Sequence, residues 1–243
     1  MRTSNKILLG IFLTAVLIIA SIHVALYAKY KSGNFSTMKT VRDEEYMKND
    51  LKTVHYIFAN GLENFKIIPS DTLRLEIEKS ERESVKFSIV GDSLIIHGDS
   101  IITHKDGTTD INRSSQQVNL YLPSSEKITV NYCETELKPA DDSNKAKSYH
   151  FALVNSANLH LTYNDYKDSS YKYINGIFIQ ADSSCSIQFK ELLKIKEANL
   201  RLRDSQFEDN NSQIEKLSID ADKKSNAKLS GSNLQILNAQ MQK

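Results

Sequence analysis

A serine in the tetrapeptide Gly91-Asp92-Ser93-Leu94 stands in a context that one class of ester hydrolases uses for its nucleophile. Such a serine needs an adjacent base, which that class takes from a downstream Asp-x-x-His pair, and this sequence has none. Residues 98–102, Gly-Asp-Ser-Ile-Ile, nearly repeat the tetrapeptide, and both copies lie between strand-like runs. A recurring turn explains both copies, so the sequence predicts no catalytic role for Ser93.

The histidines of the body show neither HExxH nor His-x-His spacing, the patterns that favour a metal site. They are His55, His97, His104, His150 and His160. His97 and His104 flank a turn-rich stretch across which they could meet, but surface strand positions account for them as well. The acidic pair Asp141-Asp142 lacks EF-hand spacing and is expected in a solvated loop. The sequence therefore predicts no catalytic residue, no metal site and no cofactor.

A group of tyrosines surrounds Asn164, Asp165 and Asp168. Its members are Tyr163, Tyr166, Tyr171 and Tyr173. Tyrosine is enriched in recognition surfaces, and aromatic faces can stack on sugars, so a binding loop is one interpretation. Packing of a long loop onto the body is the other.

Charge and cysteine content exclude several classes of protein. The chain has 31 Lys and Arg against 30 Asp and Glu, so it lacks the basic footprint of a nucleic-acid binder or a polybasic lipid-binding arm. Cys133 and Cys185 form no CxxC pair, which leaves a zinc ribbon or thioredoxin-like site unsupported. The two cysteines are either a disulfide, in an oxidising compartment, or two separate thiols.

The N-terminal segment has the composition of a transmembrane helix. Residues 7–28 contain no Asp, Glu, Lys or Arg, and the run is long enough to cross a bilayer. Lys6 precedes it, and Lys29 and Lys31 follow it. The alternative is a cleaved signal peptide, which usually has a shorter apolar region and a better cleavage site than Leu26-Tyr27-Ala28. We expect a cytoplasmic tail at 1–6, an uncleaved anchor at 7–28 and a C-terminal body outside the cytoplasm.

The rest of the chain changes from a polar segment to strand-like alternation. Residues 29–52 are expected to be a juxtamembrane linker, in which 38–51 form a short helix or a stalk. From residue 53 the apolar residues recur with period two, as in 73–78, where Leu73, Leu75 and Ile77 share one face and the charges the other. Residues 53–243 are therefore predicted to be an all-β domain.

The C-terminal third contains a degenerate repeat, in which a small-residue corner precedes an alternating strand. The corners begin at Ser156, Ser184, Ser205, Ser225 and Ser232. A period in the twenties with short strands and a corner per unit favours a stacked β-solenoid. A β-sandwich, whose strands also recur regularly, remains the alternative.

The same segments resemble the GIN-domain family, adhesin-like heads of auto-transporter type from Bacteroidetes. The resemblance rests on LRLEIEKS (73–80), VKFSIVGDSLIIHGD (85–99), VNLYLPSSEKITV (118–130) and the serine corners after residue 150. It implies an exported right-handed parallel β-helix with no known catalytic activity. The chain departs from the family in having only 8 glycines, since that family's corners are rich in Gly and Ser.

These observations predict a non-enzymatic module of the cell envelope. It would be held by a single helix in the inner membrane, with its body in the periplasm or outside the cell, and would contact an envelope protein or a glycan. The alternative is a sensor or regulatory subunit of a membrane complex.

If residues 7–28 are an uncleaved anchor, the chain will stay with the membrane after a carbonate wash, because an apolar helix does not leave the bilayer at high pH. N-terminal sequencing of the mature protein will begin at residue 1 or 2. A start near residue 29 would support the signal peptide instead.

Overall fold

The computed structural model describes residues 3–32, 45–51, 54–80, 84–98, 100–103, 109–123, 127–161 and 170–241. The chain divides into two units, Met1–Glu45 and Tyr46–Lys243. His104, Tyr163 and Tyr166, which were considered above, lie outside the described residues.

The first unit contains the helix α1 (Thr3–Lys31). Within it, Leu9–Lys31 has a mean hydropathy of 2.5 and is long and apolar enough to cross a membrane. An N-terminal signal sequence meets the same criteria, so an apolar helix is confirmed while the choice between anchor and signal stays open. Lys29 and Lys31 end the helix, where cations suit both the helix dipole and a membrane interface.

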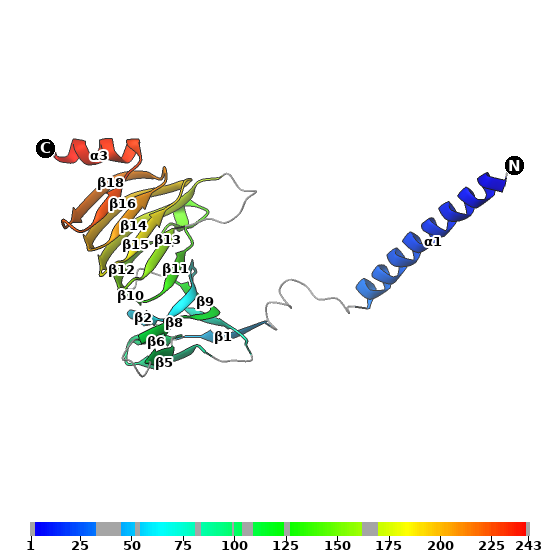
Figure 1. Ribbon diagram of the computed structural model, residues 1–243, viewed down its shortest axis with the longest axis horizontal. Helices are drawn as coiled ribbons and strands as arrows, with labels where there is room; N and C mark the ends of the chain where they lie inside the picture. The colour runs from blue at the N-terminus through cyan, green and yellow to red at the C-terminus, as the bar shows by residue number, and fades with distance from the viewer. Residues whose placement is uncertain are drawn as a thin grey trace. The chain divides into compact units, whose positions relative to one another are not determined.

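The second unit is mostly β, in two large mixed sheets and a hairpin (Figure 1). The nine-stranded sheet has, in spatial order, β1 (Tyr46–Asp50), β4 (Arg74–Glu78), β9 (Ser114–Leu122), β3 (Leu62–Pro69), β11 (Glu134–Leu137), β13 (Asn158–Leu161), β15 (Ser186–Phe189), β17 (Gln206–Asp209) and β19 (Asn226–Lys228). The eight-stranded sheet has β18 (Gln213–Ala221), β16 (Leu193–Arg203), β14 (Lys172–Asp182), β12 (Ser148–Val154), β10 (Lys127–Asn131), β2 (Tyr56–Asn60), β6 (Ser93–His97) and β5 (Lys86–Val90). The hairpin is β7 (Ser100–Thr103) with β8 (Thr109–Asn112). Two sheets fit the sandwich alternative as well as the predicted solenoid.

Consecutive strands alternate between the two large sheets from β10 to β19. We call each pair of one strand per sheet a rung: β10–β11, β12–β13, β14–β15, β16–β17 and β18–β19. Each strand pairs in parallel with the corresponding strand of the next rung. The pair β2–β3 forms a further rung beside β10–β11.

The N-terminal end of the body departs from this pattern. β1 pairs antiparallel with β4, β4 with β9, and β5 with β6. β1 falls within residues 38–51, where we expected a short helix or a stalk, because its backbone completes the sheet edge beside β4. β5 is an edge strand with all five residues exposed, including Phe87 and Ile89.

The core consists of rows of side chains that stack from rung to rung. Leu159, Ile187 and Phe207 are paired in register and almost fully buried. Ile219, at an inward position of β18, is only partly buried because β18 is the last strand of its sheet. The alternation predicted from the sequence is therefore confirmed for the inward positions.

Glu76 does not follow the expected alternation. Its side chain is 1 % exposed although it alternates with buried Leu75 and Ile77. Tyr121 Oη donates to Glu76 Oε2 at 3.0 Å, and Arg74 Nε lies 3.2 Å from Oε1. A buried carboxylate is tolerated because these partners replace its water.

The corners between the two strands of a rung use the left-handed conformation. The residues with φ from 48° to 68° there are Gly61, Tyr132, Asn155, Ser156, Ser183, Ser184 and Asp204. Hydrogen bonds join successive corners, as from Ser156 N to the Ser183 carbonyl at 2.9 Å and from Ser184 N to the Asp204 carbonyl at 2.7 Å. Regular corners therefore form here largely without glycine.

The last predicted repeat is wrong. Residues 232–236 were expected to form a corner and strand but belong to the helix α3 (Gly231–Met241). Buried Asp209 fixes the start of this helix: its Oδ2 accepts from Ser230 N, Ser230 Oγ and Asn233 Nδ2 at 3.1, 2.6 and 2.7 Å. The second unit also contains a short 3-10 helix, η1 (Ser143–Lys145).

The two cysteines are free and buried. They precede β11 and β15 at equivalent corners, and Ala157 occupies the same place in the rung between them. Asn158 N donates to the Cys133 carbonyl, and Ser186 N donates to the Ala157 carbonyl. Strands lie about 4.8 Å apart, so two rungs separate the cysteines by roughly 9–10 Å. A disulfide needs Cα atoms within about 7 Å, which resolves the choice in favour of two thiols.

Ile187→Ala should destabilise the protein by about 2–5 kcal/mol, because the substitution leaves a cavity between Leu159 and Phe207. Gln188→Ala, the next residue on the same strand but facing outward, should cost only about 0.5–1.5 kcal/mol, because it loses a single hydrogen bond with His160. Thermal denaturation measures both. Equal losses would mean that the inward and outward positions are assigned wrongly.

Neither cysteine of the folded protein should react with iodoacetamide at about pH 8, because only the thiolate attacks. Burial raises the pKa of Cys133 to about 11 and also raises the pKa of Cys185. Mass spectrometry should find both residues modified only after unfolding in urea. Rapid labelling of the native chain would contradict the buried corners.

Candidate functional site

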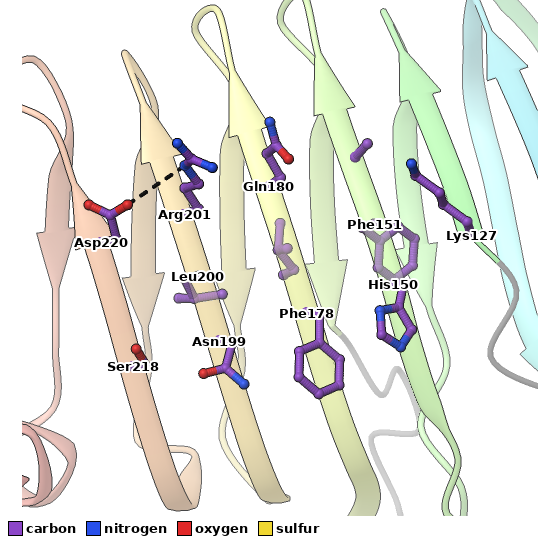
Figure 2. A pocket seen from close by; sticks show the side chains of 12 residues that line it. Lys127, His150, Phe151, Phe178, Gln180, Asn199, Leu200, Arg201, Ser218 and Asp220 are labelled. Atoms are coloured by element: carbon purple, nitrogen blue, oxygen red, sulfur yellow. Dashed lines mark ion pairs between the residues drawn. The ribbon is translucent and has the colours of Figure 1, made fainter.

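The outer face of the eight-stranded sheet carries an open pocket of about 500 Å³ that extends from β10 to β18 (Figure 2). It is lined by residues of five neighbouring strands, most of them at outward positions and three, Phe151, Ile179 and Leu200, at buried ones. The pocket is lined by Lys127, His150, Phe151, Ala152, Phe178, Ile179, Gln180, Asn199, Leu200, Arg201, Ser218 and Asp220. The parallel register arranges the outward members in two rows, since each residue lies beside its partner on the next strand.

The first row contains an aromatic pair. His150 pairs with Phe178, and Phe178 with Asn199. The rings of His150 and Phe178 stack with centroids 4.6 Å apart and planes inclined by 9°. Phe178 lies between buried Ile177 and Ile179, so alternation forces its ring to the outside. Face-to-face contact on the sheet surface holds both rings in place and leaves a rigid apolar patch.

The second row is polar, running from Gln180 through Arg201 to Asp220. Asp220 Oδ2 accepts from Arg203 Nη2 at 2.6 Å, while Arg201 Nε lies farther away, at 3.6 Å. The hydrogen bond from Arg203 lowers the pKa of Asp220, which is therefore ionised at neutral pH. The Arg201 side chain is 60% exposed, so its guanidinium is accessible to a ligand.

The two rows offer an aromatic surface and hydrogen-bonding groups, which suit the binding of a ligand. Gln180 and Asn199 each offer an amide donor and acceptor, Ser218 a hydroxyl, and Lys127 and Arg201 cationic donors. Among the residues that the structure describes, no group of three or more His, Cys, Asp or Glu is placed to hold a metal ion.

Ser93, the nucleophile candidate, begins β6 directly after a tight hairpin turn. The chain reverses at Gly91, whose φ is +63°. The antiparallel pairing of β5 with β6 starts directly beside this turn, where Val90 is the partner of Ser93. The Ser93 hydroxyl donates to Asp92 Oδ1 at 3.3 Å. The first copy is therefore a turn, as expected, while Asp99 of the second copy lies outside the described residues.

The described histidines of the β body lie on strands or beside them, and none of them pairs with another. The His97 ring meets Phe58 edge to face at 6.0 Å. His160, on the outer face of the other sheet, lies between Glu134 and Gln188, with Nε2 2.9 Å from Glu134 Oε1. Only His150 enters the pocket.

The acidic pair and the described tyrosines have structural roles. Asp141 accepts from Lys172 Nζ at 2.7 Å, and Asp142 caps η1 by accepting from Asn144 N. Lys194 Nζ lies 4.2 Å from the centroid of the Tyr171 ring, and the Tyr171 hydroxyl accepts from Gln213. Tyr171 thus packs on the body, as the second interpretation of the tyrosine group expected.

The pocket itself was not predictable from the sequence. The outward direction of Phe178 was readable from its apolar neighbours, but its contact with His150 depends on the register between β12 and β14. No local motif encodes that register.

No protein-family model and no curated protein matches the sequence. The resemblance to the GIN-domain family therefore has no support from a family model. Several solved structures are similar in part. A candidate adhesin from Bacteroides fragilis shares 11% identity at a TM-score of 0.36, covering 75% of this chain and 95% of that one.

Two further structures cover 76% of this chain. A candidate adhesin from Parabacteroides distasonis has 7% identity, a TM-score of 0.37 and 96% of its own chain covered. A candidate lipid-binding protein from the same species has 11% identity, a TM-score of 0.25 and 97% of its chain covered. TM-scores this low establish no shared function.

Proposed function

We propose that the chain is a membrane-anchored, extracytoplasmic binding module without enzymatic activity, whose eight-stranded sheet contacts saccharide chains. The observation that carries the proposal is the row of His150, Phe178 and Asn199 beside the polar row of Gln180 and Arg201.

The body that presents this face is proposed to be a right-handed parallel β-solenoid. Strands that alternate between sheets and pair in parallel with the next rung are what a coil with two strands per turn requires. A sandwich of the immunoglobulin type is built from antiparallel sheets. The antiparallel strands β1, β4 and β5 are confined to one end of the stack.

A saccharide suits the chemistry of the two rows. Sugar rings present C–H groups that pack on aromatic surfaces, and their hydroxyls both donate and accept hydrogen bonds. The stacked pair supplies the apolar patch, and the amides of Gln180 and Asn199 supply donors and acceptors within reach of it. The open shape of the pocket suits a chain that continues beyond both rims.

The helix α1 is proposed to anchor this module, with the β body outside the cytoplasm. Its 23 spanning residues and terminal lysines support an anchor. Large domains cross the membrane with little regard to charge, and a short N-terminal tail suits an export signal.

Phe178→Ala should weaken saccharide binding roughly tenfold, because the variant removes the apolar patch. The probe is a panel of immobilised neutral and uronate-containing oligosaccharides, and the protein is the full chain in detergent micelles. Phe87→Ala, which removes an exposed aromatic ring from β5 outside the pocket, is the matched control and should bind normally. Binding that survives Phe178→Ala, or a panel that retains nothing while a stoichiometric membrane protein co-purifies, would favour the regulatory-subunit alternative.

A further inference from the structure

A second pocket, of about 930 Å³, lies on the eight-stranded sheet beside the first residues of β14, β16 and β18. These residues form its floor, while Ala146, which follows η1, and Ile236 of α3 line its sides. Ile174 of the floor is buried in the core, so its neighbour Tyr173 faces outward, as does Lys194, the partner of Tyr173 on β16. None of the residues that line this pocket lines the first one.

The floor of the second pocket presents two lysines. Lys194 Nζ lies 4.2 Å from the centroid of the Tyr171 ring and 6.0 Å from that of the Tyr173 ring. A cation over an aromatic ring keeps both its charge and its hydrogen-bond donors. Lys196 is exposed, and within the part of the chain that the structure describes neither lysine forms an ion pair, although Glu215 also lines the pocket. Both ammonium groups can therefore serve a ligand.

The two pockets repeat the same residue types in the same order. β14 carries an aromatic-Ile-amide sequence twice, as Tyr-Ile-Asn at 173–175 and as Phe-Ile-Gln at 178–180. Arg201 on β16 is the partner of the second amide, and Lys196 occupies the corresponding place beside the first. Each pocket thus contains an aromatic ring, an amide on the same strand and a cation on the next strand.

Both sets face outward because the alternation shifts between them. A separation of five residues would put the two sets on opposite faces of a regular strand. Gly176 and Ile177, however, are both buried, so one position is skipped and the aromatic ring and amide of each set lie on the outer side. Figure 2 shows the second set, with Phe178 and Gln180 on β14 beside Arg201 on β16. Five residues of strand span roughly 17 Å, a distance that only a chain-like ligand can bridge.

The residues that line the two pockets carry an excess of positive charge. The cations are Lys127, Lys194, Lys196 and Arg201, and the carboxylates are Glu215 and Asp220. Asp220 already accepts a hydrogen bond at 2.6 Å from Arg203, which lines neither pocket. The whole chain has 31 basic against 30 acidic residues, so the excess is local to the pockets. Ammonium and guanidinium groups make charge-assisted hydrogen bonds to anionic oxygens, which favours a ligand with negative charge.

We propose that the second pocket is a further subsite of the saccharide-binding face, and that the ligand is an anionic saccharide chain lying along β14 and β16. The inference rests on the proposed function, because it extends the ligand bound at Phe178 to a second place. In each subsite the aromatic ring packs on the C–H groups of one sugar, the amide bonds its hydroxyls, and Lys196 or Arg201 binds an anionic group. Two equivalent sets at a fixed separation fit a polymer of repeated units, whose two contacts strengthen each other.

The test measures dissociation constants of the full chain in detergent micelles, with a long oligogalacturonate as the probe. Its methyl ester has the same backbone without the charge and should bind roughly tenfold more weakly, because it makes no charge-assisted bonds. Lys196→Gln should weaken binding of the oligogalacturonate roughly three- to fivefold and leave binding of the methyl ester unchanged. Lys190→Gln removes an exposed lysine outside both pockets, is the matched control and should change neither constant.

A sulfated galactan distinguishes the kinds of negative charge. Binding as tight as that of the oligogalacturonate would support an anionic ligand of either kind, and weaker binding would assign the ligand to the uronates. Equal binding of the oligogalacturonate and its methyl ester, weakened in both by Phe178→Ala, would leave the proposed function intact and overturn the anionic ligand. Unchanged binding of the oligogalacturonate by Lys196→Gln would overturn the second subsite. If no saccharide binds, this inference and the proposed function fall together.

Discussion

Parallel backbone pairing, kept in register from one rung to the next, is the constraint on which the rest of the second unit depends. Because the strands do not slip, equivalent side chains lie one above another at the spacing of strands. Inside, this register produces the row of Leu159, Ile187 and Phe207. Outside, it produces the stack of His150 on Phe178. One geometric rule thus builds both the core and the candidate binding face.

The stack of parallel rungs ends differently at its two ends. At the N-terminal end, antiparallel strands β5 and β1 occupy the outermost positions of the two sheets. At the other end, the Asn233 side chain bonds to the backbone of Ser212 and Ile214, and the helix α3 lies against β18. Neither end continues the parallel repeat, so neither presents an edge strand with the pairing geometry of the inner rungs.

Local pattern was enough to predict the strands, the serine corners and the side on which Leu159 or His160 lies. It was not enough for the order of the rungs, since β2–β3 lies between β10–β11 and the strands β6 and β9 that follow it in sequence. Nor could it separate residues 232–236 from a fifth serine corner, because their spacing suits either a corner or a helix. Buried Asp209, 24 residues before Asn233, decides that outcome, and such a contact is visible only in three dimensions.

The candidate site could not be predicted from the sequence because its residues also come together only in three dimensions. Stacked neighbours are 28 residues apart for His160 and Gln188 but 20 apart for Glu208 and Lys228, so rungs differ in length and no fixed period aligns the outward positions. A face assembled from one or two residues per rung has no sequence motif to find. The same construction separates binding from stability, because outward side chains alternate with the buried ones and can change without disturbing the core. Such a face can acquire new chemistry while the pairing beneath it stays fixed.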